Sequence, residues 1–132
     1  MRKINCIAID DEPIALFIIK QFCDRKGGME ITTFCDPRIG LEEIIRTKPD
    51  SVFLDIEMNG LNGLDVAKAL PVECTLIFTT AHAKYALDGF NLDAVDFLHK
   101  PIAYKRFERA VEKAMLHIGC LLYTSPSPRD RT

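Results

Sequence analysis

The sequence lacks the features that mark membrane, secreted and nucleic-acid-binding proteins. Its longest apolar stretches, such as the run IALFII, fall far short of the about 20 residues that a transmembrane helix needs. The basic start Arg2-Lys3 leads only into a strand-length apolar run and then into acids, which is not a secretory signal. The net charge is -2 with no dense basic stripe, which argues against direct nucleic-acid binding by this segment. We infer a cytoplasmic protein with no membrane partner.

Glycine-rich phosphate loops and paired cysteines are also missing. The turn after the first apolar run reads DDEP, and its acids would repel the phosphate that a glycine-rich loop binds. A dinucleotide-binding sheet therefore lacks its glycine fingerprint here. The cysteines form no CxxC pair, so we expect small buried side chains in a reducing compartment rather than metal ligands. They are Cys6, Cys23, Cys35, Cys74 and Cys120.

What the sequence does contain is a regular alternation of apolar runs and helix-length segments. Its 132 residues are enough for one domain. Runs rich in Ile, Val, Leu and Phe suit strands that are buried on both faces of a parallel sheet. Because parallel strands need crossover helices, the pattern predicts an α/β three-layer sandwich with a parallel five-stranded sheet. The five runs span 4–9, 30–34, 51–54, 75–79 and 95–99.

Five helices are predicted between and after these strands. The first begins at Pro13 and the second at Asp36-Pro37, since proline suits the first turn of a helix and aspartate suits its cap. Others are expected over 64–70, over 85–90 and from Tyr104 onward. The side chains expected to face the core are Ile14, Phe17, Ile18 and Phe22 in the first helix, Leu41, Ile44 and Ile45 in the second, and Tyr104, Phe107, Val111, Ala114 and Ile118 in the last.

Four charged residues stand where predicted strands end. Asp10 and Asp11 follow the first strand, Asp55 the third and Lys100 the fifth. Each alone is typical of a helix cap or a turn, but in an open α/β sheet ligands bind outside the carboxyl ends of the strands. Three carboxylates gathered there would repel one another unless a cation offsets them. The placement therefore predicts a divalent metal, with Lys100 as a fixed counter-charge.

From about Lys3 to Ile118 the sequence resembles the receiver domain of two-component response regulators. The resemblance implies a flavodoxin-like fold, (βα)5, with strand order 2-1-3-4-5. It also implies that the protein is a signalling domain rather than a turnover enzyme. The matching residues are Asp10, Asp11, Asp55, Thr80, Phe97 and the pair Lys100-Pro101.

The resemblance assigns Asp55 as the phosphorylation site. A carboxylate is ionised at neutral pH, so it can attack a phosphoryl group without a general base. In the family a Mg2+ ion is held by the acceptor, by one acid of the pair and by a main-chain carbonyl. Here these are Asp55, Asp11 and Glu57, with Asp10 acting through water. Such an ion relieves the repulsion between the carboxylate and the phosphoryl oxygens.

Three further residues take roles by the same resemblance. Lys100 and Thr80 would each contact a phosphoryl oxygen, and the Lys100-Pro101 bond would be cis. Phe97 would be a switch aromatic that turns inward when Thr80 moves toward the phosphoryl group. Read on its own, Phe97 is an ordinary core residue.

Other positions vary within the family or depart from its pattern. Asn59 stands where a proline is usual, so the loop after Asp55 should be less preorganised. Glu57 and His82 occupy places near the route of an attacking water. Our hypothesis is that they set the lifetime of the phosphoryl group, although His82 can also be read as an exposed loop histidine.

The resemblance is strongest to receivers that precede a LytTR-type DNA-binding domain. It implies a sensor histidine kinase as partner, a phosphorylation-dependent homodimer, and contact with DNA only through a C-terminal output domain that this sequence does not contain. Residues 3–118 form the expected receiver. Residues 119–132 break the pattern, and Cys120 to Asp130 resemble an in-frame translation of a sequencing adapter. A natural flexible linker is the alternative for that tail.

Other function classes fit the sequence less well than the receiver does. A haloacid dehalogenase-like phosphatase has its nucleophile after the first strand, whereas Asp55 follows the third. A flavodoxin-like electron carrier needs a phosphate-binding first loop and aromatics about the flavin, but this sequence has no tryptophan. A phosphorylation-independent pseudo-receiver that only binds partners stays open in principle.

Overall fold

A computed structural model describes residues 3–58, 61–70, 74–81 and 94–122 of the chain. The fourth predicted helix, over 85–90, lies outside these residues. The strands are β1 (Ile4–Ile9), β2 (Met29–Phe34), β3 (Ser51–Asp55), β4 (Glu57–Met58), β5 (Leu61–Asn62), β6 (Thr75–Thr80) and β7 (Asp96–His99). The helices are α1 (Pro13–Lys26), α2 (Pro37–Thr47), α3 (Gly63–Ala67) and α5 (Tyr104–Leu122).

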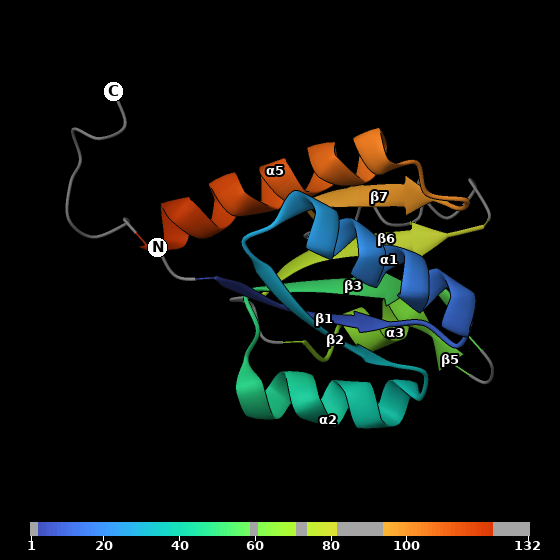
Figure 1. The fold of residues 1–132 in the computed structure, drawn as a ribbon. Helices are drawn as coiled ribbons and strands as arrows, with labels where there is room; N and C mark the ends of the chain where they lie inside the picture. The colour runs from blue at the N-terminus through green and yellow to red at the C-terminus, as the bar shows by residue number, and fades with distance from the viewer. Residues whose placement is uncertain (1–2, 59–60, 71–73, 82–93, 123–132) are drawn as a thin grey trace.

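The main sheet has five parallel strands in the order β2-β1-β3-β6-β7. Since β6 and β7 are the fourth and fifth strands of this sheet along the chain, the order 2-1-3-4-5 is confirmed. The carboxyl ends of β1, β3, β6 and β7 lie at one edge, on the right of Figure 1. A small antiparallel pair, β4 and β5, follows β3 and was not predicted.

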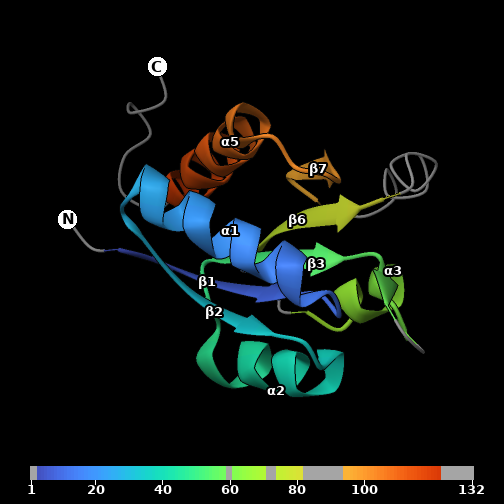
Figure 2. The same ribbon diagram turned by 45° about the vertical axis from the view of Figure 1, so that its right-hand side comes forward.

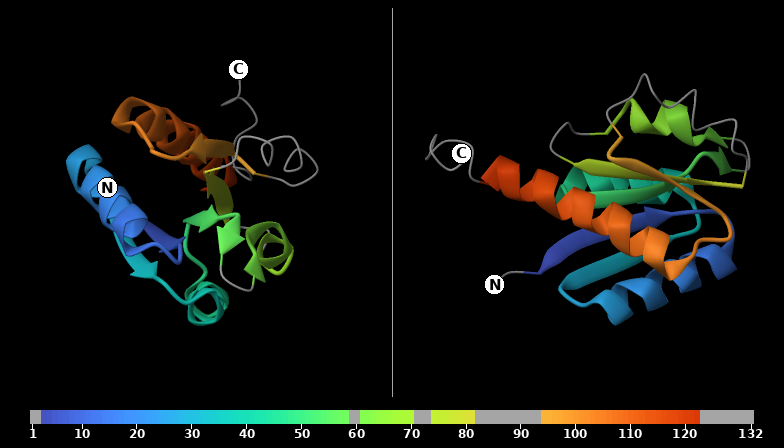
Figure 3. Two further views of the ribbon diagram at one scale, coloured as in Figure 1. Left: turned by 90° about the vertical axis from the view of Figure 1, so that its right-hand side faces the viewer. Right: turned by 90° about the horizontal axis from the view of Figure 1, so that it is seen from above.

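Helices cover both faces of the sheet, which confirms the three-layer sandwich. Alternate residues of each strand pack against α1 and α5 on one face and against α2 and α3 on the other. Figure 2 shows α1 beside α5 and α2 on the opposite side of the sheet, and Figure 3 shows the same layers end-on. Phe22 of α1 meets Phe107 of α5 with ring centroids 5.4 Å apart, which joins the two helices.

The predicted core face of α1 is wrong for Ile14 and Phe17, although Phe22 packs against the core. Ile14 and Phe17 are 75% and 62% exposed, while Leu16, Ile19 and Cys23 are buried against the sheet. The run IALFII is apolar all round the helix, so its periodicity could not select the inward face.

The other helices match the sequence more closely, with local exceptions. In α2 the Asp36 side chain caps the helix by accepting the N–H of Arg38 at 2.9 Å, as expected, but Ile45 is exposed rather than inward. Helix α3 ends at Ala67, short of the predicted range 64–70. In α5 the predicted core residues from Phe107 to Ile118 are buried, and the helix continues to Leu122.

The cysteines are free thiols at the four described positions whose side chains the structure places. Burial raises the pKa of Cys23 to about 12 and holds that of Cys6 higher still. Both therefore behave as small core residues, as predicted. Cys35 is exposed and Cys74 is half-buried, so the expectation of burial is wrong for Cys35. Among the described helices, none has the length and apolarity needed to cross a membrane.

A charge cluster holds α5 to β7. Arg106 donates two hydrogen bonds to the Asp96 carboxylate at 2.7 and 2.9 Å and a third to the carbonyl oxygen of Phe97 at 3.1 Å. Lys113 lies 3.3 Å from the same carboxylate. Burial alone would raise the pKa of Asp96, but Arg106, the Phe97 N–H and Lys113 outweigh it and hold that pKa below its ordinary value.

Asp96→Asn is expected to lower the free energy of unfolding by about 2 kcal/mol near neutral pH, because charged hydrogen bonds to Arg106 are lost. A carboxyl with a depressed folded pKa stabilises the protein above its unfolded pKa, and this contribution is lost as pH falls through the folded value. Urea unfolding should therefore separate variant and parent near neutral pH and much less in acid. An equal separation at both would contradict this, and the exposed Asp24→Asn serves as control.

Candidate functional site

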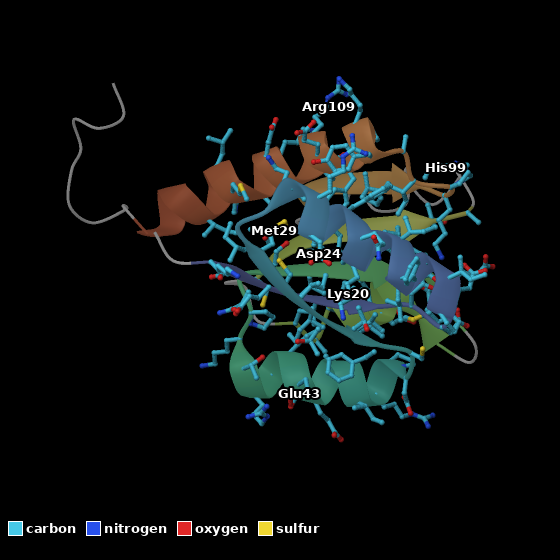
Figure 4. All side chains as sticks on the ribbon, in the orientation of Figure 1. Lys20, Asp24, Met29, Glu43, His99 and Arg109 are labelled. Carbon is cyan, nitrogen blue, oxygen red and sulfur yellow. The ribbon has the colours of Figure 1, made fainter. Side chains whose placement is uncertain are left out.

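The site lies at the carboxyl edge of the sheet, where β1, β3 and β7 end. His99, at the end of β7, marks this edge in Figure 4. The Asp10 N–H donates to the Phe34 carbonyl at 3.2 Å and the Lys100 N–H to the Thr80 carbonyl at 2.7 Å. These main-chain bonds extend the sheet to the residues that carry the charges, so the charged side chains start from fixed positions. The Lys100-Pro101 peptide bond is cis, as predicted.

Three carboxylates meet at this edge. Asp10 and Asp55 are only 1% and 3% exposed, and Asp11 is half-buried. One oxygen of each lies within 4.8 Å of the others, close enough for a single metal ion to reach all three. The Asp10 Oδ1 atom also accepts the Glu12 N–H at 2.9 Å, so the acidic pair helps to shape the start of α1 as well.

Lys100 provides the counter-charge that the sequence predicted. Its Nζ atom lies 2.7 Å from Asp10 Oδ2 and 3.4 Å from Asp55 Oδ2, and its side chain is only 13% exposed. Burial opposes the charge of Lys100, but contacts with the neighbouring carboxylates outweigh burial and hold its pKa above the ordinary value. The lysine is therefore a permanent cation.

A fourth carboxylate at this edge, that of Glu12, was missed by the sequence reasoning. Its Oε1 atom accepts a hydrogen bond from Lys100 Nζ at 2.8 Å. The only sequence signal was a third acid in the run DDEP, which does not reveal contact with a residue 88 positions away.

One carboxylate of the site carries a strongly shifted pKa. Burial raises the pKa of Asp55 to about 7, the charge of Asp10 adds to the rise, and Lys100 opposes it. The Glu57 N–H donates to Asp55 Oδ1 at 3.3 Å, which also favours the ionised form. A single lysine therefore does not fully offset the acids, and a divalent cation would supply the missing charge.

The sequence matches the family described as the response regulator receiver domain over residues 6–112. The chain belongs to this family. The receiver is 33% identical over 114 residues to the sensory transduction protein LytT of Bacillus anthracis, a match that covers 83% of this chain and 46% of that protein. The transcriptional regulatory protein LytR of Staphylococcus aureus is 33% identical over 113 residues, with the same two shares covered. The receiver thus spans about half the length of these relatives.

Solved structures show the same fold. A response regulator receiver domain from Clostridium thermocellum superposes with a TM-score of 0.82 at 24% identity, covering 89% of this chain and 98% of that one. The response regulatory domain of mrkE from Klebsiella pneumoniae gives 0.79 at 26% identity, covering 87% and 98%. The receiver has the same fold, and it is a signalling domain rather than a turnover enzyme.

Three other predicted site residues lie in β4, β6 and β7. Thr80 is buried at the end of β6, and Phe97 is half-buried, stacked on Phe78 at 5.3 Å. Glu57 begins β4 with an exposed side chain. His82 and Asn59 lie outside the described residues.

A second hydroxyl in β6 also escaped the sequence reasoning. Thr79 pairs in register with Asp55, and its buried Oγ1 atom has no hydrogen-bond partner among the described residues. The sequence has two threonines in succession, and nothing in it indicates which of the two shares a face of the sheet with Asp55. In-register partners share a face of a sheet, so Thr79 lies on the same face of the sheet as Asp55.

Proposed function

We propose that this receiver accepts a phosphoryl group on Asp55 from a sensor histidine kinase, with Mg2+, and so switches a C-terminal output domain of LytTR type. The observation that carries the proposal is the meeting of three acids with one lysine, with Lys100 Nζ 3.4 Å from Asp55 Oδ2. The names of the relatives, a sensory transduction protein and a transcriptional regulatory protein, agree with such a role. The protein would contact DNA only through the output domain.

The donor set fits magnesium. All three side chains offer hard oxygen atoms, which are the ligands that Mg2+ takes in proteins. Asp11 is half-buried, so water can reach this side of the cluster, and Mg2+ usually keeps several waters. Asp11, Asp55 and the main-chain carbonyl of Glu57 would hold the ion, with Asp10 acting through water. When bound, the ion would neutralise carboxylate and phosphoryl charge.

The transfer itself needs little from the protein beyond position and charge. An ionised Asp55 oxygen attacks the phosphorus of a phosphohistidine, so an O–P bond forms as the N–P bond breaks. The electron pair of that bond returns to the imidazole nitrogen, which takes up a proton. Lys100 and Thr80 would each donate to a phosphoryl oxygen. Hydrolysis of the acyl phosphate returns Asp55 to its free form, at a rate that Glu57 and His82 would set.

The change at Asp55 would reach the surface through Thr80 and Phe97. Thr80 ends the strand beside β7, and the ring of Phe97 lies between the sheet core and solvent. A ligand shifts the balance between two states of a surface only if its contacts differ between those states. A phosphoryl oxygen that draws Thr80 inward would leave space for Phe97. We expect this shift to favour a homodimer, in a cytoplasmic regulator.

Incubation with Mg2+ and acetyl phosphate, followed by intact-mass analysis, tests the proposal. We expect the receiver to gain one phosphoryl group and Asp55→Asn to gain none. Asp24→Asn is the matched control, since it makes the same chemical change on the exposed end of α1 and should react like the parent. An unreactive parent, under conditions where a known receiver reacts, would favour the pseudo-receiver instead.

A further inference from the structure

Three carboxylates surround the ammonium group of Lys100, and Glu12 accepts a hydrogen bond from it. The ammonium carries three N–H donors, and the carboxylates lie at 2.7 Å for Asp10, 2.8 Å for Glu12 and 3.4 Å for Asp55. A phosphoryl oxygen that binds Lys100 must therefore compete with these carboxylates. Which one leaves determines how the site rearranges.

The three carboxylates differ in how deeply they are buried. Asp10 and Asp55 are almost fully buried, whereas the Glu12 side chain is 65% exposed. A buried carboxylate that loses its cation keeps an uncompensated charge, which is costly, but an exposed carboxylate is simply hydrated. Glu12 is therefore the acceptor that leaves at least cost.

The main chain of Glu12 is fixed even though its side chain is exposed. Its N–H donates to Asp10 Oδ1 at 2.9 Å, and its carbonyl accepts from Ala15 and Leu16 at 3.1 and 3.3 Å. The carboxylate can thus swing away while the first turn of α1 stays in place. The exchange needs no movement of the backbone.

We propose that Glu12 is a positioning residue for phosphoryl transfer, whose carboxylate occupies one donor of Lys100 until a phosphoryl oxygen takes its place. This inference rests on the proposed function. The replacement of one anion by another keeps Lys100 compensated before and after transfer. It also means that Glu12 competes with the incoming phosphoryl group.

Fluoroberyllate, a non-reacting phosphoryl mimic, tests this competition at fixed Mg2+ concentration. Glu12→Gln removes the competing charge, so we expect it to bind fluoroberyllate about 5-fold more tightly than the parent, the size expected for one partly exposed ion pair. Glu12→Asp keeps the charge but is too short to hold Lys100 at 2.8 Å, so its affinity should lie between the two. Asp24→Asn should match the parent.

A second readout uses the protein without any phosphoryl mimic. Competitive acetylation of lysines, read by peptide mass, should modify Lys100 faster in Glu12→Gln than in the parent, because the ammonium loses its exposed acceptor. Parental fluoroberyllate affinity in both Glu12 variants, or unchanged Lys100 labelling in Glu12→Gln, would overturn the inference. A parent that binds fluoroberyllate while the Glu12 variants do not differ from it would leave the proposed function standing and reject only the role of Glu12.

Discussion

Gly63→Ala is expected to lower the free energy of unfolding by about 3 kcal/mol, the upper part of the range for overpacking a tight contact. A Cβ atom at Gly63 would collide with the carbonyl oxygen of Asp55 and lie 2.7 Å from the Cα of Ile56. Both neighbours are main chain, so neither can rotate away. The Gly63 N–H also donates to the Ile56 carbonyl at 2.5 Å, which ties α3 to the residue after Asp55.

Gly119→Ala is the matched control for this substitution. Gly119 lies in α5, and a Cβ there would meet no atom within 4 Å, so the change should be neutral or stabilising, as alanine favours helix more than glycine does. Urea unfolding of both variants makes the comparison. Gly63→Ala should also phosphorylate more slowly, because any relief of the collision moves the Asp55 main chain. Equal stability of the two variants would contradict the close approach of α3 to β3.

Lys100→Met is expected to cost about 3 kcal/mol at mildly alkaline pH, because it leaves buried Asp10 and Asp55 without their cation. The cost should shrink as pH falls. Burial already raises the folded pKa of Asp55, and loss of Lys100 would raise it further. A carboxyl with a raised folded pKa takes up a proton more readily when folded, so its penalty grows as pH rises from the unfolded toward the folded pKa.

Thermal unfolding across pH 6 to 9 tests this sign, because the parent carries the same Asp55 penalty up to about pH 7 and the two curves diverge only above that value. The curves for Lys100→Met and parent should converge toward the acid end and separate toward the alkaline end. Lys20→Met makes the same chemical change at an exposed position of α1 and should show no such trend. A pH-independent loss would mean that Lys100 contributes packing rather than charge compensation.

Much of the fold could be predicted because strands of a parallel sheet are covered on both faces and therefore appear in the sequence as short continuous apolar runs. The run at 51–54 is buried throughout β3, as a strand covered on both faces must be. The inward face of α1 could not be predicted, since Ile14 and Phe17 are as apolar as the buried Leu16 and Ile19. Only the packing of α1 beside α5 selects among them.

The site, like the fold, could be predicted only in part. Asp10, Asp55 and Lys100 could be placed together because parallel strands bring their carboxyl ends to one edge. Glu12 could not, since its contact with Lys100 depends on how the first turn of α1 is oriented above the sheet. Nor could the close approach of Gly63, which depends on the short β4 and β5 pair that returns the chain to β3.

Borohydride reduction tests most directly whether Asp55 carries the phosphoryl group. Borohydride converts an acyl phosphate to an alcohol, so a phosphorylated aspartate becomes homoserine while free carboxylates are unchanged. After treatment with Mg2+ and acetyl phosphate, peptide sequencing by mass spectrometry should find homoserine at position 55 and aspartate at positions 10 and 11. Homoserine at another position, or a phosphoryl adduct with aspartate intact at 55, would contradict the account.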